Sequence, residues 1–320
     1  MKKILLAVLV ALAAGPLFAR GRAEEQAPQA LVINTIKGPS GIGMIKLFET
    51  PPRISGFTVT IEAFGSQDII AAKFVSGEAQ AGILPANMAA KLAASGVPVQ
   101  IAAIVGNGML SLLTSDPEIR GIADLRGQSV EVTGRGATPE YVFRRILLAW
   151  GLDPDRDLTM TFTLSYPEIA QSLIAGRLQS ALLPEPFATM ARLGNPALRQ
   201  VADIQEEWVR AGGPANYPMI ALVVNRDFAG ANPGAVRTLL EDYRASTEWV
   251  VAHPAEAGVL TERYELGLRA PVVEAAVPRS NYVFLPAREA RPAIEALFRV
   301  FLENDPASIG GALPPEDFYF

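Results

Sequence analysis

The chain has 320 residues, half of them hydrophobic, and its 28 basic and 33 acidic side chains give a formal charge of -5. This length is sufficient for two domains or one large one, and the charge provides no broad basic surface for nucleic acid. The single histidine and the absence of cysteine exclude multi-histidine and thiolate metal sites, cysteine nucleophiles and disulfides. We therefore expect no metal and no cofactor.

The N-terminus predicts export. The basic start "MKK" precedes the apolar stretch "ILLAVLVALAAGPLFA", which has the length of a signal-peptide core and is shorter than the ~20 residues of a membrane span. We predict a signal peptide over residues 1–23, with cleavage after Ala19 or Ala23, and a disordered leader over 24–30. No cysteine follows as a lipid anchor, so the expected product is a soluble periplasmic protein. A retained N-terminal anchor is the alternative.

The next part of the chain alternates β-branched and amphipathic stretches. In chain order, the expected strands cover 30–36, 57–64, 79–84 and 99–106, and the expected helices between them cover 42–49, 66–77 and 85–96. Strands that alternate with helices in this way predict parallel βαβ units and an α/β sheet.

A second series begins after the stretch 111–116. Its expected strands cover 129–134, 158–164, 180–185 and 199–204, and its expected helices cover 137–151, 166–177 and 186–194. A further strand is expected over 219–228, and helices then dominate over 233–253, 254–266, 270–278 and 287–304.

A single doubly wound domain would carry one glycine-rich loop near its start, whereas this chain repeats the strand–loop–helix unit in its second series. We therefore predict two α/β lobes, one formed by residues 31–112 and 219–320 and the other by 113–218. The chain would cross between them near 110–116 and 214–222. Two crossings make a hinge, and the space between the lobes makes a cleft.

Two loops are candidates for the ligand site, "KGPSGIG" (37–43) and "TGRGATPE" (133–140). Each places small residues and free backbone N–H groups between a strand and a helix. Ligands bind at the carboxyl ends of strands in open α/β sheets, and helix N-termini favour anionic or strongly polar groups. One such loop on each lobe would hold a small molecule from both sides.

Three stretches carry a family resemblance, residues 65–103, 122–158 and 172–191, and the end of the chain, 304–320, also fits it. They resemble the periplasmic substrate-binding proteins of ABC importers, in the nitrate, sulfonate, taurine and thiamine-precursor class. The resemblance covers almost all of the expected mature chain. It implies a type II periplasmic binding fold with two α/β lobes joined by two crossover segments, a small organic ligand and a membrane permease as partner.

The same resemblance places the ligand at six loops, which are 37–43, 64–68, 85–87, 133–140, 164–168 and 184–186. The candidate ligand-binding residues on or beside these loops are Lys37, Ser40, Gly41, Gly43, Ser66, Gln67, Asn87, Thr133, Arg135, Thr138, Tyr166, Glu185 and Tyr217.

Most of these candidate residues also have an alternative, purely structural interpretation. The serines, threonines and Asn87 are also typical helix caps, the glycines serve backbone geometry, and the tyrosines pack in cores as readily as they stack on ligands. Arg135 offers a fork for a carboxylate or phosphate, or is an exposed loop arginine. Glu185 stands between two prolines and could contact an amine or amide.

Catalysis has little support in the sequence. The only histidine, His253, lies in the helical tail, so no Ser-His-Asp arrangement is available near the loops, and Lys37 is the one plausible nucleophile. A chorismate-dehydratase-like enzyme of the menaquinone pathway is an alternative on the same fold, although the export signal opposes it. A sensor domain is another, but it would normally be joined to a transmembrane helix. We expect a monomeric binding protein without enzymatic activity.

The ligand class remains open between a pyrimidine, a sulfonate and an aromatic acid. An aromatic or heterocyclic molecule with one anionic or amide group fits the glycine loops, Arg135, Tyr166 and Tyr217. A bare oxyanion such as nitrate usually requires more buried basic donors than these loops offer.

Overall fold

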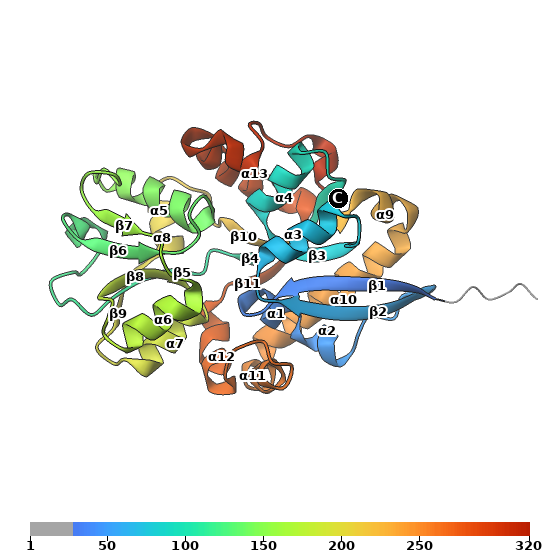
Figure 1. Ribbon diagram of the computed structural model, residues 1–320, viewed down its shortest axis with the longest axis horizontal. Helices are drawn as coiled ribbons and strands as arrows, with labels where there is room; N and C mark the ends of the chain where they lie inside the picture. Colours follow the sequence, from blue (N-terminus) through green and yellow to red (C-terminus); the bar gives the residue numbers. More distant parts are fainter. Residues whose placement is uncertain (1–27) are drawn as a thin grey trace, which may run out of the picture.

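The computed structural model describes residues 28–320, so the predicted signal peptide and most of the leader lie outside the described residues. The described chain forms an α/β protein whose two sheets lie side by side along the long axis of the molecule (Figure 1). The first strand already begins at Gln29. Residues 29 and 30 are therefore part of a strand, and the prediction that they belong to a disordered leader was wrong.

The first lobe contains a six-stranded sheet in the order β11-β4-β10-β3-β1-β2. Its strands are β1 (Gln29–Ile36), β2 (Phe57–Phe64), β3 (Ala81–Pro85), β4 (Val99–Asn107), β10 (Pro218–Asn225) and β11 (Tyr282–Pro286). The helices of this lobe are α1 (Pro39–Gly43), α2 (Ile45–Glu49), α3 (Gln67–Val75), α4 (Ala86–Ala94), α9 (Arg226–Ala231), α10 (Pro233–Ala252) and α13 (Ala287–Asn304).

The second lobe contains a five-stranded sheet in the order β7-β6-β8-β5-β9. Its strands are β5 (Leu110–Thr114), β6 (Ser129–Val132), β7 (Thr159–Thr161), β8 (Ser180–Pro184) and β9 (Arg199–Asp203). Its helices are α5 (Thr138–Ala149), α6 (Tyr166–Ile174), α7 (Phe187–Gly194) and α8 (Ile204–Arg210), with a short 3-10 turn η1 (Ile122–Leu125). The remaining elements are α11 (Pro254–Arg263), α12 (Ala270–Ala276), η2 (Val277–Arg279), η3 (Pro306–Ile309) and η4 (Glu316–Phe318).

The strand directions confirm only part of the parallel prediction. β1 pairs in parallel with β2 and β3, and β6 pairs in parallel with β7 and β8. However, β10 runs antiparallel to β3 and β4, β11 to β4, and β5 to β8 and β9. Both sheets are therefore mixed. β5 and β10 are the strands that enter a sheet after the chain has crossed from the other lobe, and each runs antiparallel to both of its neighbours.

The helices α8 and α9 and the strand β11 were not predicted. The strand predicted over 219–228 was wrong at its end, because β10 stops at Asn225 and Arg226–Phe228 belong to α9. The Asp203 side chain caps α8 by accepting hydrogen bonds from the backbone N–H groups of Gln205 and Glu206 at 2.8 and 3.2 Å. β11 is a five-residue edge strand that pairs only with β4. These elements have five to seven residues, and so short a helix or edge strand gives little periodic signal.

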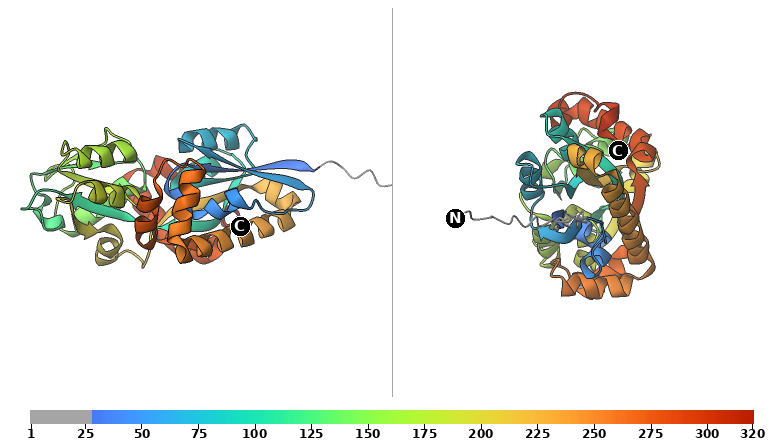
Figure 2. Two further views of the ribbon diagram at one scale, coloured as in Figure 1. Left: turned by 90° about the horizontal axis from the view of Figure 1, so that it is seen from below. Right: turned by 90° about the vertical axis from the view of Figure 1, so that its right-hand side faces the viewer.

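The chain passes between the sheets where β4 ends and β5 begins. The predicted lobe boundary at 112/113 falls inside β5, and the boundary at 218/219 falls at the start of β10. The helical tail also links the lobes, because one buried cluster joins Ile42 and Ile45 of the first lobe to Leu183 of the second and to Val250 and Ala257. Figure 2 shows α11 and α12, in orange, at the junction between the lobes.

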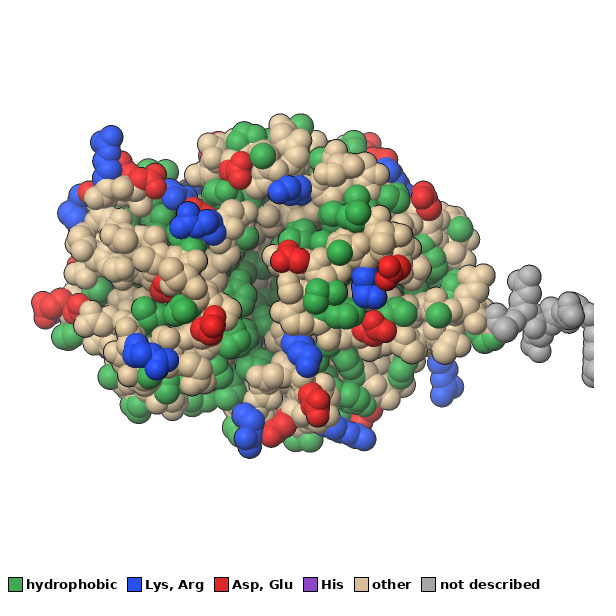
Figure 3. Space-filling view, in the orientation of Figure 1, with side chains coloured by type: hydrophobic (Ala, Val, Ile, Leu, Met, Phe, Trp, Pro, Cys, Tyr) green, Lys and Arg blue, Asp and Glu red, His purple; other side chains and the backbone are tan. Residues whose placement is uncertain are grey.

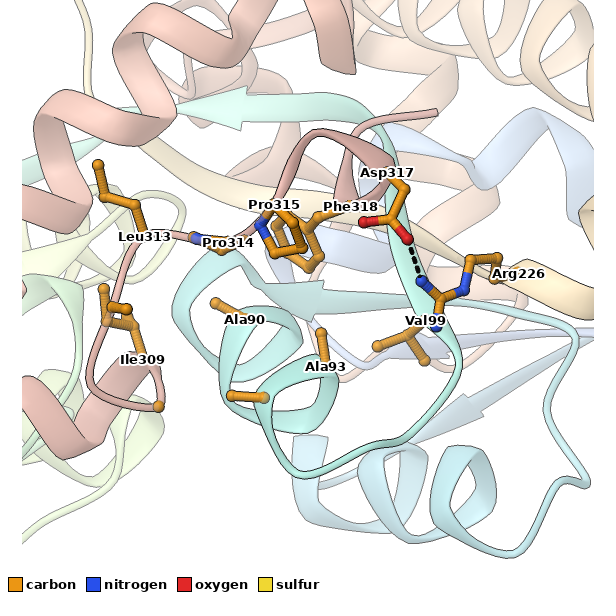
Figure 4. A pocket seen from close by; sticks show the side chains of 13 residues that line it. Ala90, Ala93, Val99, Arg226, Ile309, Leu313, Pro314, Pro315, Asp317 and Phe318 are labelled. Carbon is orange, nitrogen blue, oxygen red and sulfur yellow. Dashed lines mark hydrogen bonds and ion pairs between the residues drawn. The ribbon is translucent and has the colours of Figure 1, made fainter.

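The C-terminal segment packs back onto the first lobe, away from the junction. Arg226 forms an ion pair with Asp317 at 2.5 Å, and the backbone N–H of Phe320 donates to the carbonyl of Ile101 at 3.0 Å. Figure 4 shows the small apolar hollow between this segment and α4, with Ala90 on one side and Leu313 on the other. Of the helices in the described range, none combines the length and hydrophobicity that a bilayer span requires.

Candidate ligand-binding site

A cavity of about 540 Å³ lies between the two lobes. The space-filling view in Figure 3 shows the hollow there, with hydrophobic side chains at its floor. Its walls come from the carboxyl ends of β1, β3 and β8, from the segments that follow β2 and β6, and from the loop between α11 and α12. This is the position at which open α/β sheets bind ligands, and the volume lies within the roughly 300–1,000 Å³ of small-molecule sites.

Much of the lining is apolar and comes from both lobes. The larger apolar residues are Ile36, Leu84, Met109, Leu164, Phe187, Met219, Ile220 and Leu266. The side chains with polar groups are Lys37, Ser40, Ser66, Gln67, Asp68, Thr133, Thr138, Ser165 and Tyr166. A few convergent polar groups on an apolar surface are typical of a site for a small organic molecule.

The structure brings about half of the sequence-predicted residues to this cavity. Those that line it are Lys37, Ser40, Ser66, Gln67, Thr133, Thr138 and Tyr166. Those that do not line it are Gly41, Gly43, Asn87, Arg135, Glu185 and Tyr217. Ligand contact by any of the thirteen stays a prediction.

On the first lobe, the polar wall combines a lysine with an aspartate. The Lys37 side chain is exposed, and its backbone N–H donates to the carbonyl of Phe64 at 2.8 Å. Ser66 caps α3 by accepting the N–H of Asp68 at 3.1 Å, so capping and cavity lining occur in one residue. Ser40 is the second residue of α1 and does not cap it. Lys37 and Asp68 have opposite charges and leave this wall without net charge.

On the second lobe, the loop before α5 is held by backbone geometry. Gly134 and Gly136 have φ angles of 72° and 71°, a left-handed conformation that favours glycine. The Gly136 N–H donates to the Glu140 carboxylate at 2.7 Å, and Glu140 pairs with Arg144 at 2.9 Å. This arrangement presents Thr138, the first residue of α5, to the cavity.

Two threonine hydroxyls in this wall lack a protein partner. The side chains of Thr133 and Thr138 are 5% and 3% exposed, and neither Oγ1 atom forms a hydrogen bond within residues 28–320. Helix capping, the structural alternative for Thr138, does not occur, because α5 has no side-chain cap. Buried polar groups are normally paired, and these two lie in residues of the cavity wall without a partner.

A buried carboxylate fixes the neighbouring segment. Glu131 of β6 is 3% exposed and accepts hydrogen bonds from Thr163 N at 2.6 Å, Leu164 N at 2.9 Å and Thr163 Oγ1 at 3.1 Å, and a further one from Thr161 Oγ1. Leu164 and Tyr166 line the cavity directly after this anchor. Glu131 is not among the residues predicted from the sequence, because a lone glutamate in a strand gives no signal for such a role.

An aromatic pair forms another part of the wall. The rings of Tyr166 and Phe187 are stacked, with centroids 5.7 Å apart and an angle of 25° between their planes. Burial raises the pKa of the Tyr166 hydroxyl, and the Thr133 side chain, which lies close but does not meet the geometry of a hydrogen bond, opposes that shift. Gly38 has a φ of 104°, and a Cβ there would lie 3.6 Å from the Phe187 ring. The first lobe therefore approaches Phe187 closely at the edge of the cavity.

Glu185 has a structural role beside the cavity. It is 2% exposed, and its carboxylate accepts the N–H of Thr189 in the first turn of α7 at 3.0 Å. Burial raises its pKa, and Thr189, Arg192 and Arg279 oppose the shift.

Arg135 and Tyr217 adopt the structural alternatives given for them. Arg135 is exposed, and its guanidinium lies over the Phe162 ring at 4.5 Å from the centroid. Tyr217 is fully buried against Trp208, with ring centroids 5.6 Å apart.

The glycines of α1 and Asn87 of α4 lie behind the cavity wall. A Cβ at Gly41 would come within 2.8 Å of Leu266 Cδ1, and one at Gly43 within 3.4 Å of Tyr282. These glycines therefore allow close packing. Asn87 is the second residue of α4, is 8% exposed, and its Oδ1 has no hydrogen-bond partner in the described chain.

Sequence reasoning missed the apolar part of the site. Met109, Ile220 and Leu266 come from the first crossing, from β10 and from the helical tail, and only the tertiary fold brings them together. Phe187 carried a weak signal, because it directly follows the selected "PEP" loop. Within the described range, no group of three His, Asp or Glu side chains could hold a metal ion.

A sequence model of the NMT1/THI5-like family matches residues 54–257. The chain belongs to this family. The match covers more than half of the sequence, including most residues that line the cavity. A search of curated proteins finds no match to this NMT1/THI5-like chain.

Solved structures share the fold of this family member. An ABC transporter from Parabacteroides distasonis superposes with a TM-score of 0.76 at 24% identity, covering 91% of this chain and 98% of that one. The periplasmic aliphatic sulphonate binding protein SsuA from Escherichia coli gives 0.74 at 18% identity, covering 92% of each chain. The periplasmic nitrate-binding protein NrtA from Synechocystis PCC 6803 gives 0.65 at 15% identity, covering 90% and 83%. The two-lobed periplasmic binding fold predicted from the sequence is confirmed.

Proposed function

We propose that this protein is an extracytoplasmic solute receptor that binds a small organic molecule between its lobes and delivers it to the permease of an ABC importer. The observation that carries the proposal is the cavity of about 540 Å³, whose lining is drawn from both lobes at the carboxyl ends of their strands. The structural neighbours, which include sulphonate- and nitrate-binding periplasmic proteins, support it.

The receptor acts by closing on its ligand. The covalent path between the sheets is short at Gly108 and Met109, so a small rotation there brings Lys37 and Ser66 of one wall toward Thr138 and Tyr166 of the other. A ligand held by both walls stabilises the closed form, which is the form that a permease would recognise. We propose a monomer without catalytic activity as the working state.

Native mass spectrometry tests this function on the mature protein purified from its own host without unfolding. We expect a carried small organic molecule, and we expect cells lacking the gene to lose uptake of that molecule. Cell fractionation should find the chain outside the inner membrane without residues 1–19. A full-length cytosolic protein that carries no small molecule, or one that turns over chorismate, would reject the receptor and favour the enzyme.

A further inference from the structure

Helices α3, α4, α5, α6 and α7 all begin at the cavity, but their N-termini differ in charge. The first turns of α3 and α6 contain the carboxylates of Asp68 and Glu168. At α7, the Glu185 carboxylate lies just before the helix and accepts an N–H of its first turn. None of these carboxylates has a salt-bridge partner in the described structure. Each therefore occupies the favourable position for negative charge at its own helix.

The N-terminus of α5 is different. Its N-cap, Ala137, offers no side-chain acceptor, and its second residue, Pro139, has no N–H. The acidic residue of its first turn, Glu140, accepts the N–H of Gly136 and forms an ion pair with Arg144 at 2.9 Å. Arg144, which also pairs with Asp155 at 2.9 Å, compensates part of the Glu140 charge. The start of α5, like that of α4, whose first turn contains no acidic residue, therefore favours an external acceptor more than the other three, and α5 also has two threonines beside it.

The two unpartnered hydroxyls provide a second, independent observation at the same place. Thr133 and Thr138 flank the loop before α5, are at least 95% buried, and both line the cavity. A buried hydroxyl without a partner disfavours folding, so its retention toward a cavity points to an acceptor supplied by a ligand. Together with the α5 terminus, the hydroxyls form a cradle of neutral donors.

The remaining cavity surface selects the body of the ligand. Phe187 stacks on Tyr166, and Met109, Ile220 and Leu266 close the other sides. A nitrate ion is not much larger than a water molecule, whose share of liquid volume is about 30 Å³, and it would leave most of the 540 Å³ unfilled. A flat apolar body fills this space and gains offset stacking on the aromatic pair.

We propose that the ligand is a small aromatic molecule with one acceptor head group. The head group binds the hydroxyls of Thr133 and Thr138 at the start of α5, and the ring lies against Phe187 between the apolar walls. Carboxylate, sulfonate and carboxamide share the required acceptor oxygens. This inference rests on the proposed receptor function and specifies the chemistry of that same site.

Isothermal calorimetry with a matched panel tests the class. The aromatic probes are benzoate, 2-naphthoate, benzenesulfonate and benzamide, and the controls are acetate, methanesulfonate and nitrate, which have head groups but no ring. We expect at least one aromatic probe to bind tenfold or more tighter than its ring-free control. The head group of the tightest aromatic probe identifies which acceptor the cradle prefers.

Equal or tighter binding of the ring-free controls would overturn the aromatic class and leave the receptor function standing. Absence of binding by every aromatic probe would also overturn it. Failure of the receptor function is a separate result, in which the native protein carries no small molecule and uptake does not depend on the gene.

Isosteric variants test the anchor with the tightest aromatic probe. Thr133→Val and Thr138→Val should each weaken binding about tenfold, as expected for loss of a hydrogen bond to a charged or strongly polar group, whereas Thr133→Ser and Thr138→Ser should retain it. Thr35→Val is the matched control, because Thr35 is 0% exposed and its Oγ1 is also unpartnered, but it does not line the cavity.

The stability of the ligand-free variants separates binding from a structural role. All three valine variants should unfold at the same temperature as the wild type or higher, since each removes an unpartnered buried hydroxyl. Only the two cavity variants should lose affinity. Wild-type affinity in both Thr133→Val and Thr138→Val would overturn the anchor.

Discussion

The carboxylate of Glu131 accepts the backbone N–H of Leu164 at 2.9 Å. Glu131 lies in β6 and is almost fully buried, while Leu164 is the first of a run of residues, Leu164 to Pro167, that line the cavity. A strand of the second sheet is thereby tied to the loop that carries Tyr166. The position of that part of the cavity wall depends on one buried side chain.

Replacing Glu131 with glutamine should weaken ligand binding as well as stability. The amide has one acceptor oxygen and directs N–H donors at a site where the partners are also donors. We expect a loss of about 1–3 kcal/mol in the free energy of unfolding and roughly tenfold weaker binding, because the loop with Tyr166 is released. Urea denaturation and calorimetry with the carried ligand measure the two quantities.

Glu207→Gln is the matched control for a purely structural effect. Glu207 is 6% exposed, accepts a hydrogen bond from Trp150 Nε1 at 2.8 Å and does not line the cavity. It should lose stability without losing affinity. If Glu131→Gln behaves in the same way, Glu131 supports the fold and does not position the site.

The pH dependence of stability should reveal the buried Glu185. Its pKa is raised by burial, so the folded protein holds this proton more tightly than the unfolded chain. Protonated Glu185 therefore makes its full contribution to the free energy of unfolding below the ordinary pKa of 4.5. That contribution is lost as the pH rises through the raised pKa of the folded protein. Glu185→Gln keeps an acceptor for Thr189 without the buried charge. We expect its melting temperature to exceed that of the wild type at pH 7, and the difference to shrink toward pH 4.

Glu168→Gln should show the opposite sign. The hydroxyl and backbone N–H of Ser165 lower the pKa of Glu168, so its stabilising contribution is present above its ordinary pKa and is lost on acidification. The variant should be less stable than the wild type at pH 7 and similar to it in acid. Parallel pH profiles for the two variants would contradict the raised pKa of Glu185.

The alternation of strands and helices could be predicted from the sequence because it is local. β-Branched runs such as Phe57–Phe64 and amphipathic runs such as Thr138–Ala149 carry their own period. Strand direction at β5 and β10 could not, because it depends on which sheet each strand joins after crossing between the lobes. The same fragment of chain is compatible with either direction until its partners are known.

The site was predictable where it follows strand ends and not where it depends on tertiary contacts. Ser66, Thr133 and Thr138 lie at or within four residues of the ends of the predicted strands 57–64 and 129–134, and they were identified. Arg135 was selected because its charge and glycine neighbours suit an anion, but two residues of loop separate it from Thr138, and its guanidinium turns outward onto Phe162. Ile220 and Leu266 reach the cavity only through the folding of distant segments.

Arg135→Ala should therefore have little effect on ligand binding. The guanidinium does not line the cavity and interacts with Phe162 at 4.5 Å, an exposed contact worth about 0.5–1 kcal/mol of stability. We expect a change in affinity of less than about twofold in calorimetry, which is less than 0.5 kcal/mol. A tenfold loss would place Arg135 in the site and argue against an anchor made of neutral donors.

The first crossing between the lobes depends on Gly108. A Cβ at this position would lie 2.2 Å from Gln205 Oε1 and 2.4 Å from Tyr217 Cε1. The Gly108 carbonyl also accepts a hydrogen bond from the side-chain N–H of Asn281 at 3.0 Å. Gln205 can rotate away, but Tyr217 is fully buried and cannot move without disturbing Trp208. Gly108→Ala should thus destabilise the protein by about 1–3 kcal/mol. Gly121→Ala, where a Cβ meets nothing within 4 Å, should stay within about 0.5 kcal/mol of the wild type.

The same variant tests whether the crossing acts as a hinge. In small-angle scattering, the wild type should show a smaller radius of gyration with the carried ligand than without it, and ligand at 100 times its Kd should add about 2.7 kcal/mol of stability. In Gly108→Ala, the packing of Tyr217 must shift to admit the new methyl group, so we expect a smaller contraction and weaker binding although no cavity residue has changed. Gly121→Ala should contract as the wild type does. Full contraction and wild-type affinity in Gly108→Ala would mean that the lobes move about another segment, and the second crossing before β10 would then be the place to look for the hinge.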